Sequence, residues 1–358
     1  MIKLGKTIWN NKWYLLLIAL AIAITIKGFN TYAEYQEFLS KPLVMQQQQP
    51  VNFIVEPGDT IRHIASDLKT KGLLEEPTFL AVRARMRKMA LSIKVGEYSI
   101  EVGTTPDELL DQLVKGKVIQ YSLTLIEGWT FKEAMAAINQ HPEIRHTLID
   151  HNPEQIMEAL GLPGEHPEGR FFPETYRFPK KTTDVDFLKR AYKHMDDFLK
   201  QAWDQRAKDI PLKTPYEALI MASIIEKETG VDSEYRQVSG VFTRRLQKGM
   251  RLQTDPTVIY GMGSAYQGNI KRIHLRQDNP YNTYTRAGLP PTPIALPGAD
   301  AIRAALNPAA GKSLYFVSKG DGSHYFSNTL KEHNEAVIKY QLKGDRSKAF
   351  TSKPNPDK

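Results

Sequence analysis

An apolar stretch near the N-terminus constrains this chain more than any other feature. Residues 13–26 read WYLLLIALAIAITI, and three lysines precede them within the first twelve residues. With Lys27 extended toward the lipid headgroups, residues 8–29 are long enough to cross roughly 30 Å of hydrocarbon as one helix. A cleaved signal peptide is the alternative, because the uninterrupted apolar core is short and residues 31–33 (TYA) resemble a cleavage site. We favour the uncleaved anchor.

The lysines before the span predict its orientation. Basic residues flank the cytoplasmic end of membrane helices, so we expect residues 1–7 in the cytoplasm and the chain beyond residue 29 outside it. The sequence contains no second apolar stretch of spanning length. These features together predict a single-pass membrane protein.

Composition narrows the chemistry. The 358-residue chain has no cysteine, so disulfides, thiolate metal sites and thiol nucleophiles are excluded. Its net charge of +8 would suit nucleic acid or an anionic surface. Much of that charge lies in the N-terminal tail and in RARMRK (83–88), which equally fits a solvated helix face, so we expect no nucleic-acid partner.

Residues 30–50 are predicted to form a linker, because KPLVMQQQQP is polar, rich in glutamine and bounded by prolines. An internal repeat follows, in which a glycine is followed two residues later by a threonine and then by apolar residues at helical spacing. Its three copies are VEPGDTIRHIASDL (55–68), IEVGTTPDELLDQL (100–113) and LIEGWTFKEAMAAI (125–138).

Each copy predicts a strand that ends at a glycine turn and a helix capped by threonine, namely Thr60, Thr105 or Thr130. In the second and third copies, Glu108 and Glu133 stand three residues after the threonine and complete a capping box. The first copy, with its strand, also resembles a LysM module, a small fold that binds glycans containing N-acetylglucosamine. A generic capped helix is the alternative.

The remainder of the chain alternates helical and irregular stretches. Helices are expected around 131–160, 185–207 and 235–250, and again near the C-terminus. SLYFVSKGDGSHYFS (313–327) has two apolar and aromatic runs around an Asp-Gly turn, which predicts a β-hairpin. The fold class is therefore α+β.

The helix predicted at YEALIMASIIEKETG (216–230) carries the strongest chemical signal. Its central residues leave no polar face, so we expect the helix to be enclosed. Glu226 and Glu228 fall in its last turn, with Gly230 as the expected left-handed cap. The negative end of the helix dipole and loss of water both raise a carboxyl pKa, as a general acid requires. The alternative is that Glu226 forms an ion pair with Lys227 or a distant arginine.

Other chemistries lack their motifs. The sequence has no HExxH pattern, and its C-terminal histidines lack metal-ligand spacing, so we expect no metal. Serine-hydrolase, penicillin-binding, Walker and Rossmann patterns are absent as well. Acid–base chemistry or binding remains, in a cleft rich in tyrosine, asparagine and glutamine.

Five stretches in order resemble the motifs of the YceG-like family, the membrane-anchored endolytic murein transglycosylases. They are EGRFFPETY (168–176), ASIIEKETG (222–230), VFTRRLQKGMRLQTDPTVIYGMG (241–263), YNTYTRAGLPPTPIALPG (281–298) and YFVSKGDGSHYFSNTLKEHNEAV (315–337). The resemblance implies a LysM-like domain at 51–120, a catalytic domain at 121–345 and a flexible tail at 346–358.

The resemblance also implies a mechanism. The first glutamate of the EKET motif, Glu226, is expected to protonate the bond between N-acetylmuramic acid and N-acetylglucosamine. The 6-hydroxyl of the muramic acid then attacks its own anomeric carbon and leaves a 1,6-anhydro end. No cofactor is needed, and one glutamate suffices because the nucleophile comes with the substrate.

Supporting roles are expected for six further residues. Glu174 and Asp255 are candidate second acids, with a local cap and an Asp-Pro turn as the respective alternatives. Gln253, Asn282 and Tyr284 are expected to contact sugar rings, and Glu228 to support the site. The expected partners are peptidoglycan glycan strands, the inner membrane and peptidoglycan synthases (penicillin-binding proteins). Two rival functions stay open: a muramidase that uses water, and a glycan-binding scaffold that does not cleave.

Overall fold

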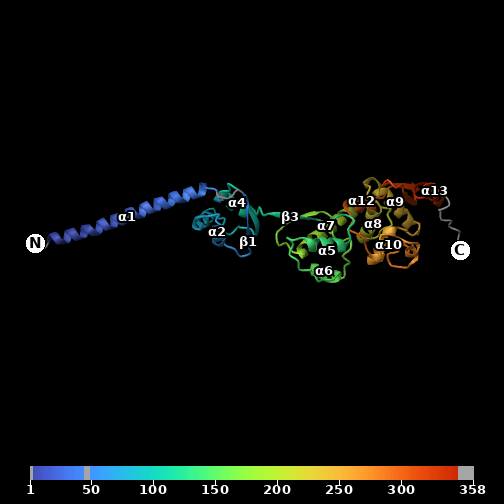
Figure 1. Ribbon diagram of the computed structural model, residues 1–358, viewed down its shortest axis with the longest axis horizontal. Helices are drawn as coiled ribbons and strands as arrows, with labels where there is room; N and C mark the ends of the chain where they lie inside the picture. Colours follow the sequence, from blue (N-terminus) through green and yellow to red (C-terminus); the bar gives the residue numbers. More distant parts are fainter. Residues whose placement is uncertain (1–2, 44–48, 346–358) are drawn as a thin grey trace. The chain divides into compact units, whose positions relative to one another are not determined.

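The computed structural model describes residues 3–43 and 49–345, which fold as an α+β protein (Figure 1). The chain divides into two compact units between residues 121 and 122, next to the expected boundary between residues 120 and 121. The described residues form three sheets of two strands each. The tail expected at 346–358, residues 44–48 of the expected linker and residues 1–2 lie outside the described residues.

The first unit contains α1 and a small α/β body. Its elements are α1 (Lys3–Ser40), β1 (Val51–Val55), α2 (Ile61–Thr70), α3 (Pro77–Met86), β2 (Gly96–Ile100), α4 (Pro106–Lys115) and the start of β3 (Gln120–Thr124). β1 and β2 pair antiparallel, with Val51 opposite Ile100 and Val55 opposite Gly96. The inner faces of the two strands pack on α2, α3 and α4, so this unit has its own apolar core.

Helix α1 is long and apolar enough to cross a membrane, and its apolar side chains from Trp13 to Ile26 are exposed. It continues to Ser40, so the segment 30–40, predicted as part of a linker, is helical instead. This segment has neither proline nor glycine, and Pro42 disfavours helix at the residue before it. Tyr35 and Phe38 pack against the ring of Phe79 in α3, with centroids 5.5 and 5.7 Å away.

The three repeat copies form the predicted strand–turn–helix units, and their caps are confirmed. The Thr60, Thr105 and Thr130 side chains each accept the backbone N–H three residues further on. Glu108 and Glu133 close the two predicted capping boxes. The turn glycine of each copy has a positive φ, between 78° and 93°, which a residue with a Cβ rarely adopts.

The second unit surrounds one buried helix. Its elements are α5 (Phe131–Gln140), α6 (Pro153–Leu160), β4 (Thr175–Pro179), α7 (Asp184–Asp204), α8 (Pro215–Glu228), α9 (Tyr235–Gln247), α10 (Asp255–Met262), α11 (Arg272–Arg276), α12 (Ala299–Leu306), β5 (Tyr315–Ser318), β6 (His324–Ser327) and α13 (Leu330–Tyr340). β4 pairs with β3. The predicted hairpin is confirmed by β5 and β6, with Tyr315 opposite Ser327.

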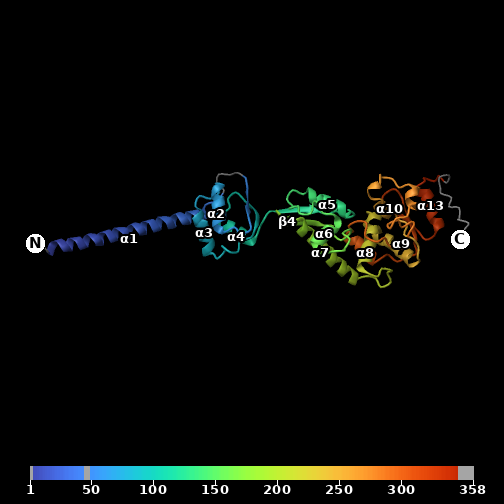
Figure 2. The same ribbon diagram turned by 90° about the horizontal axis from the view of Figure 1, so that it is seen from below.

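The prediction that α8 is enclosed is confirmed. Every side chain from Ala218 to Ile225 is buried, and the helix contacts α7, α9, α10 and α12. Figure 2 shows α8 beside α7 and α9. Burying a leucine or isoleucine side chain stabilises a fold by about 1.5–3 kcal/mol, so this helix anchors the unit. The predicted left-handed cap at Gly230 is wrong. Thr229 is extended and its hydroxyl accepts the N–H of Val231 at 3.1 Å, which turns the chain without glycine.

Candidate active site

A cavity of about 510 Å³ lies beside the C-terminal end of α8. Four of the seven predicted site residues line it: Glu228 from α8, Gln253 and Asp255 at the start of α10, and Tyr284 from the loop after α11. The hairpin β5–β6 and helix α13 supply the other walls. This volume lies within the range of small-ligand sites, which is about 300–1,000 Å³.

Glu228 is the carboxylic acid of this cavity. Burial raises its pKa to about 7, and the nearby charge of Asp255 acts in the same direction. The Thr254 hydroxyl donates a hydrogen bond to Oε1 of Glu228, which offsets part of this rise. A carboxyl group with a pKa near 7 carries a proton for a large part of the time at neutral pH, as a general acid must.

Asp255 and Tyr284 form a hydrogen-bonded pair on the cavity wall. The Tyr284 hydroxyl donates to Oδ1 of Asp255 at 2.6 Å. Asp255 is the first residue of α10, where the positive end of the helix dipole favours a negative charge. Gln253 has a φ of +52°, a conformation that strains a non-glycine residue and that often marks functional sites.

Arg245 adds a buried cation that the sequence did not single out for this site. Its guanidinium donates to the carbonyl oxygens of Leu314 and Leu252, at 2.7 and 2.9 Å, and lies 5.0 Å from the ring centroid of Tyr315. Its charge acts on Glu228 in the direction of a lower pKa, a smaller effect than burial. The cavity therefore joins an acid, an anion and a cation.

Glu226 lies on a different side of α8. Residues two apart on a helix are separated by about 200°, so Glu226 and Glu228 cannot face one site. Oε1 of Glu226 accepts the Tyr235 hydroxyl at 3.1 Å, and Oε2 accepts the Gly298 N–H at 2.9 Å. Burial raises the pKa of Glu226, and the charge of Glu127 raises it further. Glu226 is not among the residues that line the cavity.

The face of α8 beside Glu226 is covered by another part of the chain. Ser223, one of its small neighbours on α8, accepts the N–H of Ile294 at 3.0 Å and donates to the carbonyl of Ile220. The alternative ion pair is not formed either. Arg244 and Arg245, distant arginines that could have paired with Glu226, donate to backbone carbonyls instead.

Two further predicted residues lie elsewhere. Asn282 is buried, and its amide donates to the carbonyls of the 274–277 segment while its Oδ1 accepts the N–H of Tyr284. Its polar atoms therefore shape the loop, which argues against the predicted sugar contact. Glu174 is exposed and pairs with His194 at 2.9 Å, in a separate depression.

Sequence reasoning missed two carboxylates. Glu127 lies against Gly298, because a Cβ at that glycine would be 2.0 Å from Oε1 of Glu127. Glu168 is buried, accepts the N–H of Phe131 and the hydroxyl of Tyr260, and has its pKa raised to about 7 by burial. The only sequence signal for Glu168 was its place at the head of EGRFFPETY. Within residues 3–43 and 49–345, no group of three or more histidine, cysteine, aspartate or glutamate side chains is arranged to hold a metal ion.

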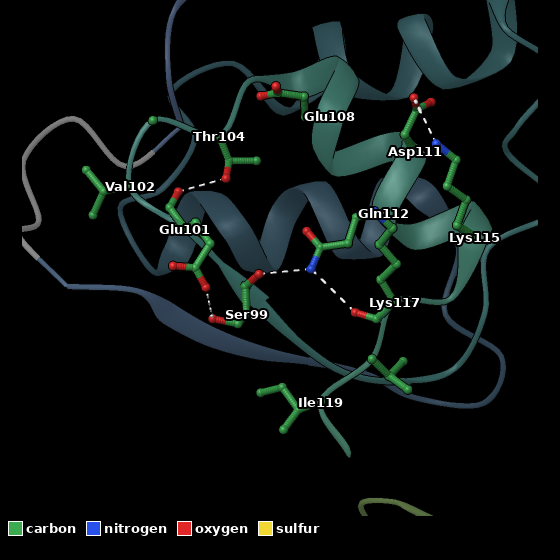
Figure 3. A pocket seen from close by; sticks show the side chains of 12 residues that line it. Ser99, Glu101, Val102, Thr104, Glu108, Asp111, Gln112, Lys115, Lys117 and Ile119 are labelled. Atoms are coloured by element: carbon green, nitrogen blue, oxygen red, sulfur yellow. Dashed lines mark hydrogen bonds and ion pairs between the residues drawn. The ribbon is translucent and has the colours of Figure 1, made fainter.

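A second cavity, of about 580 Å³, lies in the first unit between the β2–α4 loop and α4 (Figure 3). Its carboxylates are engaged: Glu101 accepts the Ser99 hydroxyl, and Asp111 pairs with Arg87 and Lys115. Gln112 donates to the Ser99 carbonyl. These contacts hold the walls together and leave no acid resembling Glu228.

Fold and cavity together define a class: an α+β protein with a protonatable glutamate at the end of a buried helix. Comparison with known protein families finds a match over most of the chain: the model of the YceG-like family matches residues 53–339. The chain belongs to the YceG-like family.

Three relatives illustrate this kinship. The endolytic murein transglycosylase of Bacillus subtilis is 30% identical over 324 residues, which cover 86% of this chain and 89% of that protein. The one of Streptococcus pneumoniae strain D39 is 26% identical, and the match covers 90% of this chain and 65% of that longer protein. A crystal structure of a putative YceG-like protein from Listeria monocytogenes has 27% identity and a TM-score of 0.50, over 81% of this chain and 99% of the other.

Proposed function

We propose that this protein is a membrane-anchored lytic transglycosylase that cleaves the β-1,4 bond between N-acetylmuramic acid and N-acetylglucosamine in peptidoglycan. The observation that carries the proposal is the raised pKa of Glu228 in a cavity that also holds Asp255 and Tyr284. The relatives named endolytic murein transglycosylase support the substrate class and the reaction.

The acid assignment differs from the one that the sequence suggested. Glu228 is our first candidate, because it lines the cavity, whereas both oxygens of Glu226 are engaged by Tyr235 and Gly298. Glu226 remains the second candidate, since its pKa is also raised by burial. The variants Glu228→Gln and Glu226→Gln distinguish the two candidates.

In the proposed reaction, Glu228 gives its proton to the glycosidic oxygen as the bond to the anomeric carbon breaks. The resulting carboxylate then accepts the proton of the muramic acid 6-hydroxyl, whose oxygen bonds to the same carbon. The product carries a 1,6-anhydro ring, and no water is consumed. Asp255 is close enough to affect the Glu228 charge and supplies the negative potential that favours a cationic transition state at the sugar ring.

The rest of the proposal concerns location. Helix α1 is the proposed anchor, with residues 1–7 in the cytoplasm and both units in the periplasm, as the lysines before the span favour. Residues 51–120 are proposed as a LysM-like glycan-binding domain, and peptidoglycan synthases as partners of the whole chain. The LysM-like domain and the synthase partners rest on the sequence resemblance.

Mass spectrometry of digested peptidoglycan tests the function. A lytic transglycosylase leaves anhydro ends, a muramidase leaves reducing ends, and a scaffold leaves no new ends. We expect anhydro ends from the wild type and none from Glu228→Gln, with Glu226→Gln as the matched control. Reducing ends from the wild type would establish the muramidase instead, and the absence of new ends would establish the scaffold.

A further inference from the structure

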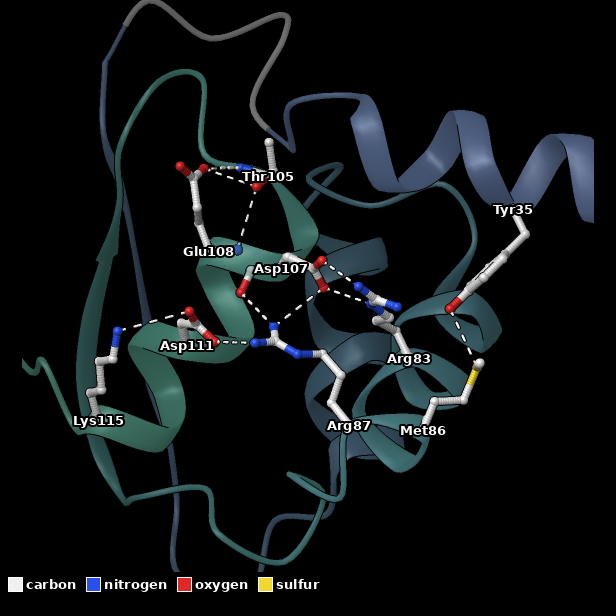
Figure 4. A network of polar contacts seen from close by, with 9 residues as sticks. All are labelled: Tyr35, Arg83, Met86, Arg87, Thr105, Asp107, Glu108, Asp111 and Lys115. Carbon is white, nitrogen blue, oxygen red and sulfur yellow. Dashed lines mark hydrogen bonds and ion pairs between the residues drawn. The ribbon is translucent and has the colours of Figure 1, made fainter.

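The C-terminal end of α3 lies close to the point where α1 would leave the membrane. The Tyr35 hydroxyl of α1 contacts the sulfur of Met86, the last residue of α3, at 3.6 Å (Figure 4). Tyr35 follows Phe29, the end of the expected span, by about 9 Å of helix rise. Lipid headgroups extend about 5–7 Å beyond the hydrocarbon on each side, so Met86 lies near the headgroup layer.

The direction of α3 supports this placement. Phe79, near the start of α3, packs on Phe38 as well as Tyr35, whereas Met86 contacts Tyr35. Helix α3 therefore runs back along α1 toward the membrane, and the 87–95 segment follows at that end. Arg62, near the start of α2, and Arg85, near the end of α3, line one pocket of about 380 Å³, so both side chains border the same surface.

The basic residues of this region divide into two groups. Arg83 and Arg87 turn toward α4, where they pair with Asp107 and Asp111 at 2.6 and 2.7 Å (Figure 4). The side chains of Arg62, Arg85 and Lys88 are exposed and have no ion-pair partner within 3–43 and 49–345. Asp59, the acid nearest Arg62 in sequence, is itself paired with His63 at 2.6 Å.

Apolar side chains stand among these cations. Met86 is 65% exposed and Leu91 is fully exposed. Unpaired cations with exposed apolar side chains are the combination that binds the interface of an anionic membrane, where each cation contributes about 1 kcal/mol.

We propose that Arg62, Arg85, Lys88, Met86 and Leu91 form a docking end of the first unit, which binds the phosphates of anionic phospholipids in the bilayer that α1 enters. The cations contact phosphate groups, and Met86 and Leu91 insert among the headgroups. Docking fixes the orientation of this unit on the membrane, which a single helix alone would not do. The proposal rests on α1 being a membrane anchor.

The absence of native cysteine makes the test direct. The full chain with Leu91→Cys, labelled with an environment-sensitive fluorophore, is reconstituted in vesicles of phosphatidylcholine alone or of an equimolar mixture with phosphatidylglycerol. A quencher attached to the lipid headgroups reports contact. The matched control is Val102→Cys, which is also exposed but lies near Thr104, whose carbonyl accepts the N–H of Leu43 beyond the end of α1.

We expect quenching at position 91 in the phosphatidylglycerol vesicles, little at position 102, and release by high salt. Adding Arg62→Gln, Arg85→Gln or Lys88→Gln should each lower the ratio of docked to undocked unit about fivefold. Lys69→Gln, at the other end of α2, should leave it unchanged.

Vesicle flotation separates the two claims. A chain that fails to float overturns the anchor and the docking with it. A chain that floats without quenching at position 91 overturns the docking alone. Equal quenching in both kinds of vesicle, insensitive to salt, overturns the role of anionic phospholipid. Floating and cleavage of peptidoglycan should persist in the glutamine variants, because these side chains are exposed and outside the active site.

Discussion

Replacing Glu228 with glutamine should abolish catalysis and at the same time stabilise the protein at alkaline pH. Glutamine keeps the shape of the side chain and an oxygen that accepts from the Thr254 hydroxyl, but it can neither donate the acidic proton nor ionise. Loss of a general acid typically costs about 10²–10⁴-fold in rate. The two effects have opposite signs because burial, which makes the acid useful, also makes its ionised form costly.

The size of the stability effect follows from the pKa. Burial raises the pKa of Glu228 from an ordinary 4.5 to about 7. The folded state holds this proton more tightly than the unfolded state, so the contribution of Glu228 is fully present below about pH 4.5 and is lost as pH rises through 7. A shift of this size corresponds to about 3 kcal/mol. Between about pH 4 and pH 8 the wild type should therefore lose about 3 kcal/mol more than Glu228→Gln, because the raised pKa of Glu168 acts equally in both proteins.

Urea denaturation of the detergent-solubilised full chain at several pH values measures this difference, alongside release of anhydro ends. Glu226→Gln is the matched control, because Glu226 lies on a different side of α8, and it should retain most of the activity. Full activity in Glu228→Gln with loss in Glu226→Gln would refute the cavity argument and restore the assignment from the sequence. A free energy of unfolding that changes with pH equally in wild type and Glu228→Gln would refute the burial argument.

Three more outcomes are expected. Activity should fall as pH rises through about 7, because Glu228 must carry its proton; a pH–rate profile without this alkaline limb would argue against it. Glu174→Gln should leave the cleavage rate within about twofold of the wild type, since this exposed residue pairs with His194 outside the cavity. Asp184→Ala should lower the free energy of unfolding by about 3 kcal/mol, as judged by urea midpoints, because the buried carboxylate accepts the N–H and hydroxyl of Thr147; an unchanged midpoint would contradict this.

Local signals predicted local structure well. The G-x-T repeats gave their turns and caps, and the Asp-Gly turn gave the hairpin, because each depends on contacts within a few residues. Helix α12 was missed, although Ala299–Leu306 favours a helix, since its neighbourhood is rich in proline and glycine. The last turn of α8 was predicted correctly, but the left-handed conformation expected at Gly230 was wrong, because Thr229 turns the chain through a contact between its own hydroxyl and the Val231 N–H.

The sequence by itself determined that α8 is buried and that two glutamates end it, because an unbroken apolar run has no solvent face to offer. Only the tertiary structure decided which glutamate meets a cavity. The faces of Glu226 and Glu228 are equivalent in the helix, and distant segments distinguish them. The 294–298 segment closes over Glu226, whereas α10, the β5–β6 hairpin and α13 leave an open volume beside Glu228. Packing between residues far apart in the chain made this choice, and no pattern within the helix encodes it.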